Sequence, residues 1–337
     1  MRIGNNPEKE QNILEIDAYH RVVLPIYIPN LTEPYFQDGL KILKLCLHSL
    51  LKTVHAKTRI SIINNNCCSE VSNYLESLYC EHEKIDQLLN SKINLGKINA
   101  LYAAIKSNLE PIITIADADV MFLPHWQQAV ENTLVEFPEC GMVSPVPSSI
   151  AYRGQYLNST IYYAFFKGKL KFKKIKNPDG LIKFQESVGR EMYNEMHLKK
   201  HLVVSNKKGK AVIGCGHFLA TFRAEVFKNS PRENCKFKIV GGSENRYLDK
   251  PNDKAGFLRL ATLKNYGYHL GNKEEIWMHD ELNKLNNFNV TYNTIKSLPK
   301  PKTIGYLGHK MGQLMHLLFF KKFKKVYFGL KGMKNPY

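Results

Sequence analysis

Two carboxylates follow directly behind an apolar run in the stretch Pro111-Ile-Ile-Thr-Ile-Ala-Asp-Ala-Asp-Val-Met-Phe122. Residues 112–116 do not alternate with polar residues, which is typical of a central strand covered on both faces. In α/β sheets ligands bind beyond the carboxyl ends of such strands, where Asp117 and Asp119 would stand. An Asp-x-Asp pair on a turn can hold one hard cation, Mg²⁺ or Mn²⁺, whose open positions accept a diphosphate; a solvated turn is the alternative.

The composition is that of a globular protein with anionic partners. The chain has 337 residues, of which 44% are hydrophobic, enough for one large domain or two modest ones. A net charge of +18 predicts contact with nucleotides, phospholipid head groups or nucleic acid. Because the sequence shows neither a signal-peptide pattern nor a long apolar run, we expect no export signal and no membrane span. The seven cysteines lack the paired spacing of metal sites, and we expect reduced thiols in the cytosol.

Strand and helix signals alternate through the first half of the chain. Apolar runs predict strands at 21–29, 59–66, 112–116 and 141–146. Between them, apolar residues at intervals of three and four in 36–53 predict a helix that packs back on the sheet, and Gly96 precedes an Ala-rich helix. This alternation predicts an α/β fold with a doubly wound, mostly parallel sheet.

Five stretches, taken in order, resemble the inverting family 2 glycosyltransferases of the GT-A (nucleotide-diphospho-sugar transferase) fold, which is Rossmann-like. They are Leu24-Pro-Ile-Tyr-Ile-Pro, Cys46-Leu-His-Ser-Leu-Leu-Lys-Thr, Ile62-Ile-Asn-Asn-Asn, Asn94-Leu-Gly-Lys-Ile-Asn-Ala and Asp117-Ala-Asp119. The resemblance covers about residues 21–280. It implies inverting, metal-dependent transfer of a sugar from a nucleotide-diphosphate donor to a hydroxyl acceptor, with Mn²⁺ or Mg²⁺ as the cofactor. The acceptor that it suggests is a bacterial surface glycan or a lipid-linked oligosaccharide.

The resemblance also divides the chain. It implies a polar leader at 1–20 and a GT-A catalytic domain at 21–298. Within that domain, 21–147 is the nucleotide-binding half and 148–298 is the acceptor half. Near 167–210 the acceptor half is rich in lysine, and we expect a mobile insertion there. The last part, 299–337, is a basic amphipathic segment with nine lysines and no acid.

By resemblance, the donor site uses residues at strand ends and at a helix start. The nucleotide-binding residues would be Pro25, Tyr27, Asn65, Asn94, Lys97 and Asp117, and the metal ligands Asp117, Asp119 and His269. Asn65 stands nearest the family's aspartate, so the family's usual preference for uridine is not carried over. The plainer alternatives are that the amides at 64–66 are turn residues, that Lys97 is a solvated surface lysine and that His269 is a core histidine.

The base that deprotonates the acceptor is harder to assign. The family has a Glu-Asp pair at a helix start, with a helix glycine twelve residues after the Glu. Here Glu244 precedes Gly256 by that interval, but Asn245 stands in the Asp position. An amide cannot accept a proton at neutral pH, so Glu244 is favoured, with Asp249 or Asp253 as alternatives if the register slips. For the histidine near the diphosphate or metal, two residues are weaker candidates than His269: His217 suits the acceptor wall, and His279 suits a surface pair with Asp280.

Two other functions compete. A sugar-phosphate nucleotidyltransferase would share the sheet and the aspartates, but it opens strand one with a Gly-x-Gly-Thr-Arg loop, which this sequence lacks. A nucleic-acid-binding protein would explain the positive charge. However, the charge concentrates at 167–176 and 300–337, outside the α/β core, and we expect no nucleic-acid partner.

The C-terminal segment predicts a location. Leu314, Leu317, Leu318 and Phe328 recur at roughly helical intervals beside the lysines of 321–325. Such a helix binds an anionic membrane surface, which predicts a cytoplasmic protein that is peripheral on the inner face of the cell membrane. A helix that docks on the catalytic domain is the alternative.

Overall fold

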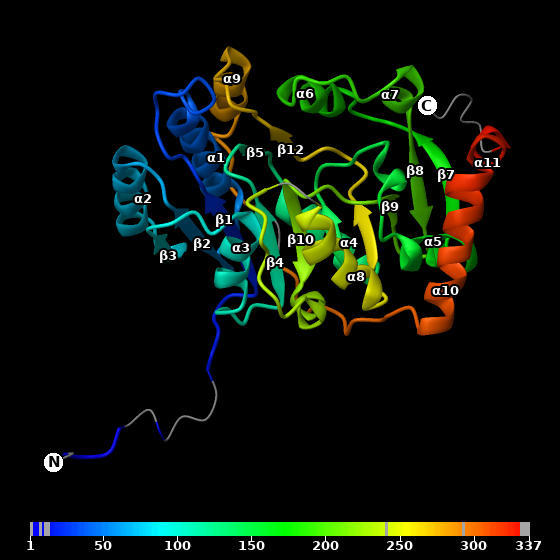
Figure 1. Ribbon diagram of the computed structural model, residues 1–337, viewed down its shortest axis with the longest axis horizontal. Helices are drawn as coiled ribbons and strands as arrows, with labels where there is room; N and C mark the ends of the chain where they lie inside the picture. Colours follow the sequence, from blue (N-terminus) through cyan, green and yellow to red (C-terminus); the bar gives the residue numbers. More distant parts are fainter. Residues whose placement is uncertain (1–2, 7–8, 10–13, 240–241, 292–293, 331–337) are drawn as a thin grey trace.

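The computed structural model describes residues 3–6, 9, 14–239, 242–291 and 294–330 (Figure 1). Parts of the predicted leader and the last residues of the predicted C-terminal segment lie outside this range: 1–2, 7–8, 10–13 and 331–337.

One ten-stranded sheet runs through the described chain in the order β3-β2-β1-β4-β10-β6-β11-β9-β8-β7. The strands are β1 His20–Ile26, β2 Thr58–Asn65, β3 Ile85–Ser91, β4 Ile112–Ala116, β6 Cys140–Ser144, β7 Lys169–Lys174, β8 Lys200–Ser205, β9 Lys210–Ile213, β10 Leu219–Arg223 and β11 Leu258–Ala261. Only β10, β9 and β7 run against the other seven. The predicted α/β class with a mostly parallel sheet is confirmed. Two short strands, β5 (Val120–Phe122) and β12 (Gly267–His269), form a separate antiparallel ribbon.

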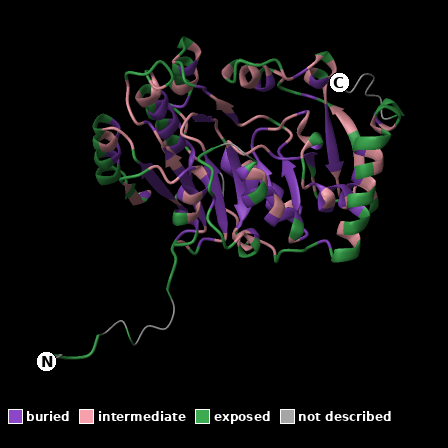
Figure 2. Cartoon of the chain, in the orientation of Figure 1, coloured by how far each residue is buried: buried purple, intermediate pink, exposed green. Residues whose placement is uncertain are grey.

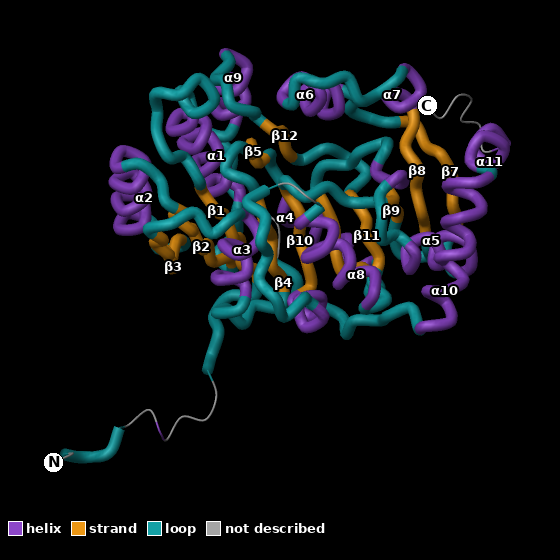
Figure 3. The backbone as a smooth tube through the Cα atoms, in the orientation of Figure 1, coloured by secondary structure: helices purple, strands orange, loops and turns teal. Residues whose placement is uncertain are grey.

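Helices cover both faces of the sheet, as the predicted doubly wound arrangement requires (Figure 3). They are α1 Gly39–Thr53, α2 Ser69–Glu81, α3 Lys97–Ile105, α4 Trp126–Glu136, α5 Asn158–Phe166, α6 Asp179–Ser187, α7 Glu195–Lys199, α8 Lys250–Lys254 and α9 Ile276–Lys284. Alternate residues of β1 belong to different cores. Val22 and Leu24 pack with residues of α1, α2 and α4, whereas Val23 packs with residues of α3. The central strands are therefore buried on both sides, as Figure 2 shows.

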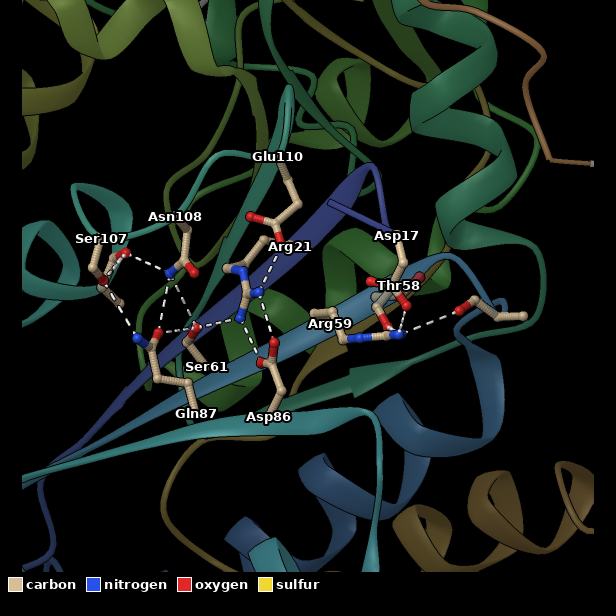
Figure 4. Close-up of polar contacts among 12 residues, drawn as sticks. Asp17, Arg21, Thr58, Arg59, Ser61, Asp86, Gln87, Ser107, Asn108 and Glu110 are labelled. Atoms are coloured by element: carbon tan, nitrogen blue, oxygen red, sulfur yellow. Dashed lines mark hydrogen bonds and ion pairs between the residues drawn. The ribbon is translucent and has the colours of Figure 1, made fainter. Parts of the chain in front are cut away.

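An ion-pair network, buried at Arg21 and Glu110 but exposed at Asp86, fixes β3. The sequence analysis missed this strand because polar residues interrupt it. Arg21 of β1 contacts both carboxylate oxygens of Asp86 in β3, at 2.6 and 2.8 Å, and Glu110 ahead of β4 at 2.6 Å (Figure 4). It also donates to Ser61 of β2 at 2.9 Å. Removing one partner of a buried pair such as Arg21–Glu110 typically costs about 3–5 kcal/mol. The side chain of Arg21 thus joins β1, β2, β3 and the segment ahead of β4, at the end of β4 opposite to that of the acidic pair.

The lysine-rich stretch near 167–210 is not a mobile insertion, which corrects the expectation. It supplies β7 and β8, which extend the sheet, and the helices α6 and α7. Leu170 and Phe172 of β7 are half-buried, and the Phe172 ring lies 5.7 Å from that of Phe328. Lysines at the alternate positions of this edge strand discourage pairing with another chain. The sequence analysis missed β7 because its lysine and apolar residues alternate over only six positions within a polar stretch.

Three consecutive helical segments end the described chain: α10 (Tyr306–Met315), the π-helical η5 (His316–Lys322) and α11 (Lys324–Leu330). A Cβ added to Gly312 of α10 would lie 1.9 Å from the carbonyl oxygen of Asn158, so only glycine permits this approach to α5. Phe328 is fully buried, which corrects its predicted place in an exposed stripe. No helix in the described ranges has the length and apolar character needed to cross a bilayer.

Candidate active site

The acidic pair lies on the turn between β4 and β5. Asp119 has one carboxylate oxygen, Oδ1, that is buried and lacks a hydrogen-bond partner among the described residues. Its Oδ2 lies 3.4 Å from Nε2 of His269. His269 reaches this position because β12 pairs with β5, which sets His269 opposite Val120. A buried carboxylate oxygen without a partner is costly unless a ligand or an ion satisfies it.

Lys97, the first residue of α3, bridges two carboxylates. Its Nζ lies 2.5 Å from Oδ1 of Asp117 and 2.6 Å from Oε1 of Glu244. Burial alone would lower the pKa of Lys97, but the two carboxylates outweigh it and raise that pKa. Burial raises the pKa of Asp117 despite the ammonium group beside it. The lysine therefore stays charged in the site.

Close backbone packing sets the start of α3. Gly96 has φ +75°, and a Cβ there would lie 2.9 Å from the carbonyl oxygen of Phe237. Asn65 at the end of β2 accepts from the amide of Leu95 at 2.8 Å and donates to Asn94 at 3.1 Å, while Asn94 accepts from the amide of Gly96 at 2.8 Å. Asn65 and Asn94 thus hold the turn that presents Lys97.

A second group of charged side chains continues from Glu244 into the interior. Nδ1 of His217 lies 3.5 Å from Oε2 of Glu244, and Nε2 of His217 lies 2.7 Å from Oδ1 of Asp249. Asp249 is buried and pairs with Arg259 of β11 at 2.9 Å. Asp249 is the last residue of the π-helical turn η4 (Asn245–Asp249). In such a turn the hydrogen bonds join residues five apart, so Glu244 and Asp249 lie near enough on one side for both to contact His217.

A cavity of about 410 Å³ opens beside these groups. Among the residues that line it are Asp117, His217, Glu244, Asn245, Asp249 and His269. Its apolar wall includes Phe184 of α6 stacked on Phe218, with ring centroids 5.4 Å apart and an interplanar angle of 17°. This size suits a small organic ligand with a few fixed polar contacts.

Several predicted site residues lie outside the lining of this cavity. Pro25 and Tyr27 are not among the residues that line the cavity, and the Tyr27 ring packs edge-on to Phe36. Asp253 accepts from the amide of Ser159 at 2.8 Å and from the Asn158 side chain at 2.8 Å, so it caps α5. His279 is exposed on α9 and pairs with Glu274 at 2.9 Å rather than with Asp280.

Sequence reasoning missed the wall that α6 provides and the partner of Asp249. Ser187, the last residue of α6, lies 3.0 Å from Nδ1 of His269, and Phe184 and Phe218 meet the same imidazole edge-on. Phe218 follows His217 directly, so the Gly-His-Phe stretch carried some signal. Phe184 and Ser187 lie in the lysine-rich stretch, which has no such signal.

A separate buried cluster also has metal-ligand chemistry. Single ligand atoms of His20, His55 and Glu131 lie within 4.8 Å of one another. However, Nδ1 of His55 accepts from the amide of Lys57 at 3.1 Å, so its Nε2 carries the proton that faces Glu131 at 2.9 Å. A protonated nitrogen cannot ligate, so these residues fit a hydrogen-bonded network rather than a metal.

Comparison with known proteins gives structural likenesses alone. No protein-family profile and no curated protein matches the sequence. The chain is similar to the mannosyltransferase PcManGT from Pyrobaculum calidifontis in complex with GDP-Man and Mn²⁺, at 14% identity and a TM-score of 0.40, over 76% of this chain and 59% of that one. It is similar to S. aureus TarS 1-349 at 13% identity and a TM-score of 0.40, over 80% of this chain and 70% of that one. For TarS 1-349 in complex with UDP-GlcNAc the values are 13% and 0.40, over 77% and 60%. The chain therefore spans between 59% and 70% of the length of these three structures.

Proposed function

We propose that this protein is a glycosyltransferase that moves a sugar from a nucleotide-diphosphate donor to a hydroxyl acceptor. The observation that carries the proposal is the carboxylate of Asp119 beyond the carboxyl end of β4. Its Oδ1 is buried and lacks a partner among the described residues, and its Oδ2 lies 3.4 Å from Nε2 of His269. The support is local: the same strand end holds Asp117, and α3 brings Lys97 to it.

The donor set fits a divalent cation, Mn²⁺ or Mg²⁺. Asp117 and Asp119 offer oxygen ligands and His269 offers a nitrogen, a combination that suits Mn²⁺ in particular. When bound there, the cation would offset the negative charge that develops on the leaving diphosphate. Ser187 would orient His269 through its contact with Nδ1.

The chain's own residues would hold the donor as follows. Lys97 would meet the diphosphate with its ammonium group and give up its contact with Asp117 to do so. Asn65 and Asn94 would keep the start of α3 in place, and the amides at the end of β2, with Pro25 and Tyr27, would bind the base and ribose. Phe184 and Phe218 would exclude water from the sugar.

Inversion requires one base on the acceptor side of the cavity. Glu244 and Asp249 both line it, and Asp253 lies in the cap of α5. Among these carboxylates the resemblance favours Glu244, with Asp249 as the alternative. The acceptor that we propose is a surface glycan or a lipid-linked oligosaccharide.

A test needs only the donor and water. The full chain is incubated with a panel of nucleotide sugars in Mn²⁺ or EDTA, and release of the nucleoside diphosphate is measured. We expect release from at least one donor in Mn²⁺, none in EDTA, and a loss of at least a hundredfold in Asp119→Asn. Asp280→Asn, a change at an exposed residue of α9, is the matched control and should behave as wild type. Equal release by wild type and Asp119→Asn would refute the site.

We also propose that the protein works at the inner face of an anionic membrane. Residues 167–210 carry thirteen Lys or Arg against four Asp or Glu, and residues 300–337 carry nine lysines and no acid. These two segments account for the whole net charge of +18. They meet at one end of the sheet, where Phe172 of β7 packs on Phe328 of α11. The attraction of lysines to anionic lipid is about 1 kcal/mol for each one near the surface.

Apolar side chains on the same end favour lipid over a polar polyanion. The large hydrophobic side chains exposed along α10, η5, α11 and the residue between the last two are Tyr306, Leu307, Met311, Leu314, Leu317, Phe323, Val326 and Leu330. Figure 2 shows this outer face of α10 in the exposed colour. An apolar stripe flanked by lysines is the pattern of helices that lie in a membrane surface.

A further inference from the structure

A chain of four polar side chains links the cavity to the interior: Glu244, His217, Asp249 and Arg259. Asp249 and Arg259 are buried, with 1% and 3% of their surfaces exposed, and His217 keeps 20% of its side chain exposed toward the cavity. The contacts along the chain are 3.5, 2.7 and 2.9 Å. The fold brings these four residues together, since His217 and Arg259 lie in segments other than the turn that carries Glu244 and Asp249.

The contact with Asp249 decides which nitrogen of His217 carries the proton. A carboxylate paired with a guanidinium has only acceptors to offer, so Nε2 of His217 must donate to Asp249. In the neutral imidazole, Nδ1 then has a free lone pair. That nitrogen is the one that faces Glu244 on the cavity side, at 3.5 Å.

Glu244 is the competing base, and its surroundings weaken it. Its Oε1 is 2.6 Å from the ammonium group of Lys97. Burial alone would raise the pKa of Glu244, but its charged surroundings, with the ammonium group of Lys97 the largest contribution, lower that pKa. A carboxylate that holds its negative charge more readily is a poorer proton acceptor. Asn245, beside it, has an amide without basic character.

We propose that His217, oriented by Asp249, takes the proton of the acceptor hydroxyl, and this inference rests on the proposed function. The O–H bond of the acceptor breaks and its proton forms a bond to Nδ1 of His217. The acceptor oxygen forms a bond to the anomeric carbon as the bond from that carbon to the diphosphate oxygen breaks, and the electron pair leaves with the nucleoside diphosphate. Asp249 is a positioning residue, because it acts through His217.

The charged groups around His217 are consistent with this role. Glu244 and Asp249 flank it from the two ends of η4, Arg259 approaches Asp249 from β11, and Lys97 approaches Glu244 from α3. The two carboxylates would stabilise the imidazolium that forms when the proton arrives. Each of the two carboxylates also has a basic partner of its own, Lys97 for Glu244 and Arg259 for Asp249.

The first experiment compares rate with binding in the full chain. His217→Gln should slow release of the nucleoside diphosphate at saturating donor by a factor of 10²–10⁴, the usual contribution of general-base catalysis, while the Kd of the donor changes by less than about threefold. His279→Gln, at an exposed histidine on α9, is the matched control and should keep the wild-type rate. A His217→Gln rate within a few-fold of wild type, with Glu244→Gln inactive, would overturn this assignment. A wild type that binds and turns over no donor would instead refute the proposed function and this inference with it.

The second experiment needs no ligand. Long-range ¹H–¹⁵N correlations of the ¹⁵N-histidine-labelled chain report the tautomer of each imidazole, and His217→Gln identifies the signal of His217 by its disappearance. We expect neutral His217 to carry its proton on Nε2, and Asp249→Asn to shift that proton signal. A proton found on Nδ1 would refute the proposal even if the variant were inactive, because Nδ1 could not then accept one.

Discussion

The buried carboxylate of Glu131 makes a quantitative prediction about stability. It lies in α4 and accepts from His20 at 2.8 Å, from His55 at 2.9 Å and from the Tyr19 hydroxyl at 3.0 Å. Burial alone would raise the pKa of Glu131, but the contacts with the two histidines outweigh it and lower that pKa from 4.5 to about 2. Because the folded state holds the charge more tightly than the unfolded chain, the carboxylate stabilises the fold above pH 4.5 and loses this contribution as the pH falls toward 2.

The magnitude follows from that difference in pKa. At about 1.4 kcal/mol for each pH unit, a fall from 4.5 to about 2 corresponds to about 3 kcal/mol. Glu131→Gln keeps the shape and removes the charge. It should lower the free energy of unfolding by about 3 kcal/mol at pH 7, and by about half as much at pH 3. Both proteins lose stability in acid for other reasons, since buried His20 resists protonation, so the difference between the two curves carries the effect.

Urea unfolding at pH 7, 5 and 3, followed by tryptophan fluorescence, measures this difference. Trp126 is a built-in probe, because its ring lies 5.9 Å from that of His20 in the same buried cluster. The matched control is Glu76→Gln on the exposed side of α2, which should change the free energy of unfolding by less than about 0.5 kcal/mol. A loss below 1 kcal/mol at pH 7, or one that is the same at pH 3 as at pH 7, would refute the reasoning.

Three further predictions concern the site and the C-terminal helices. Glu244→Gln removes the charge that pairs with Lys97 but should leave the Kd of the donor, measured by calorimetry beside turnover, within about threefold of wild type. A tenfold loss of donor binding would contradict this. Gly312→Ala should destabilise α10 by about 1–3 kcal/mol, since the clash exceeds the gain of about 1 kcal/mol in helix propensity, and hydrogen exchange should rise in α10 but not in the control Gly329→Ala, which meets open space; unchanged exchange in α10 would contradict the packing. Leu314→Glu should reduce flotation with vesicles of 30% phosphatidylglycerol at low salt, whereas the control Ile276→Glu, at a still more exposed residue of α9, should not; equal flotation of both variants would assign the stripe no role in lipid binding.

The parts of the site that could be read from the sequence are those encoded by adjacent residues. A buried strand followed at once by Asp117 and Asp119 is such a signal, and so is a glycine ahead of Lys97, because each depends on local geometry. The sheet was readable where apolar runs were long, and unreadable at β3 and β7, which a buried arginine network and an aromatic contact with α11 stabilise.

The pairing of His217 with Asp249 could not be read from the sequence. It depends on a π-helical turn and on a buried arginine that arrives from a distant strand. The sequence analysis expected His217 in an acceptor wall and gave no reason to expect a partner; in the structure His217 lines the cavity. The same limit applies to Asp253, whose role as a cap depends on where α5 begins.

Calorimetric titration of the full chain with nucleotide sugars, with and without Mn²⁺, tests the central claim most directly. The account predicts that at least one donor binds in Mn²⁺, that binding weakens at least tenfold in EDTA, and that Asp119→Asn loses this dependence on the metal. Donor binding that is the same in Mn²⁺, in EDTA and in the variant, or no binding of any donor by the wild type, would contradict it.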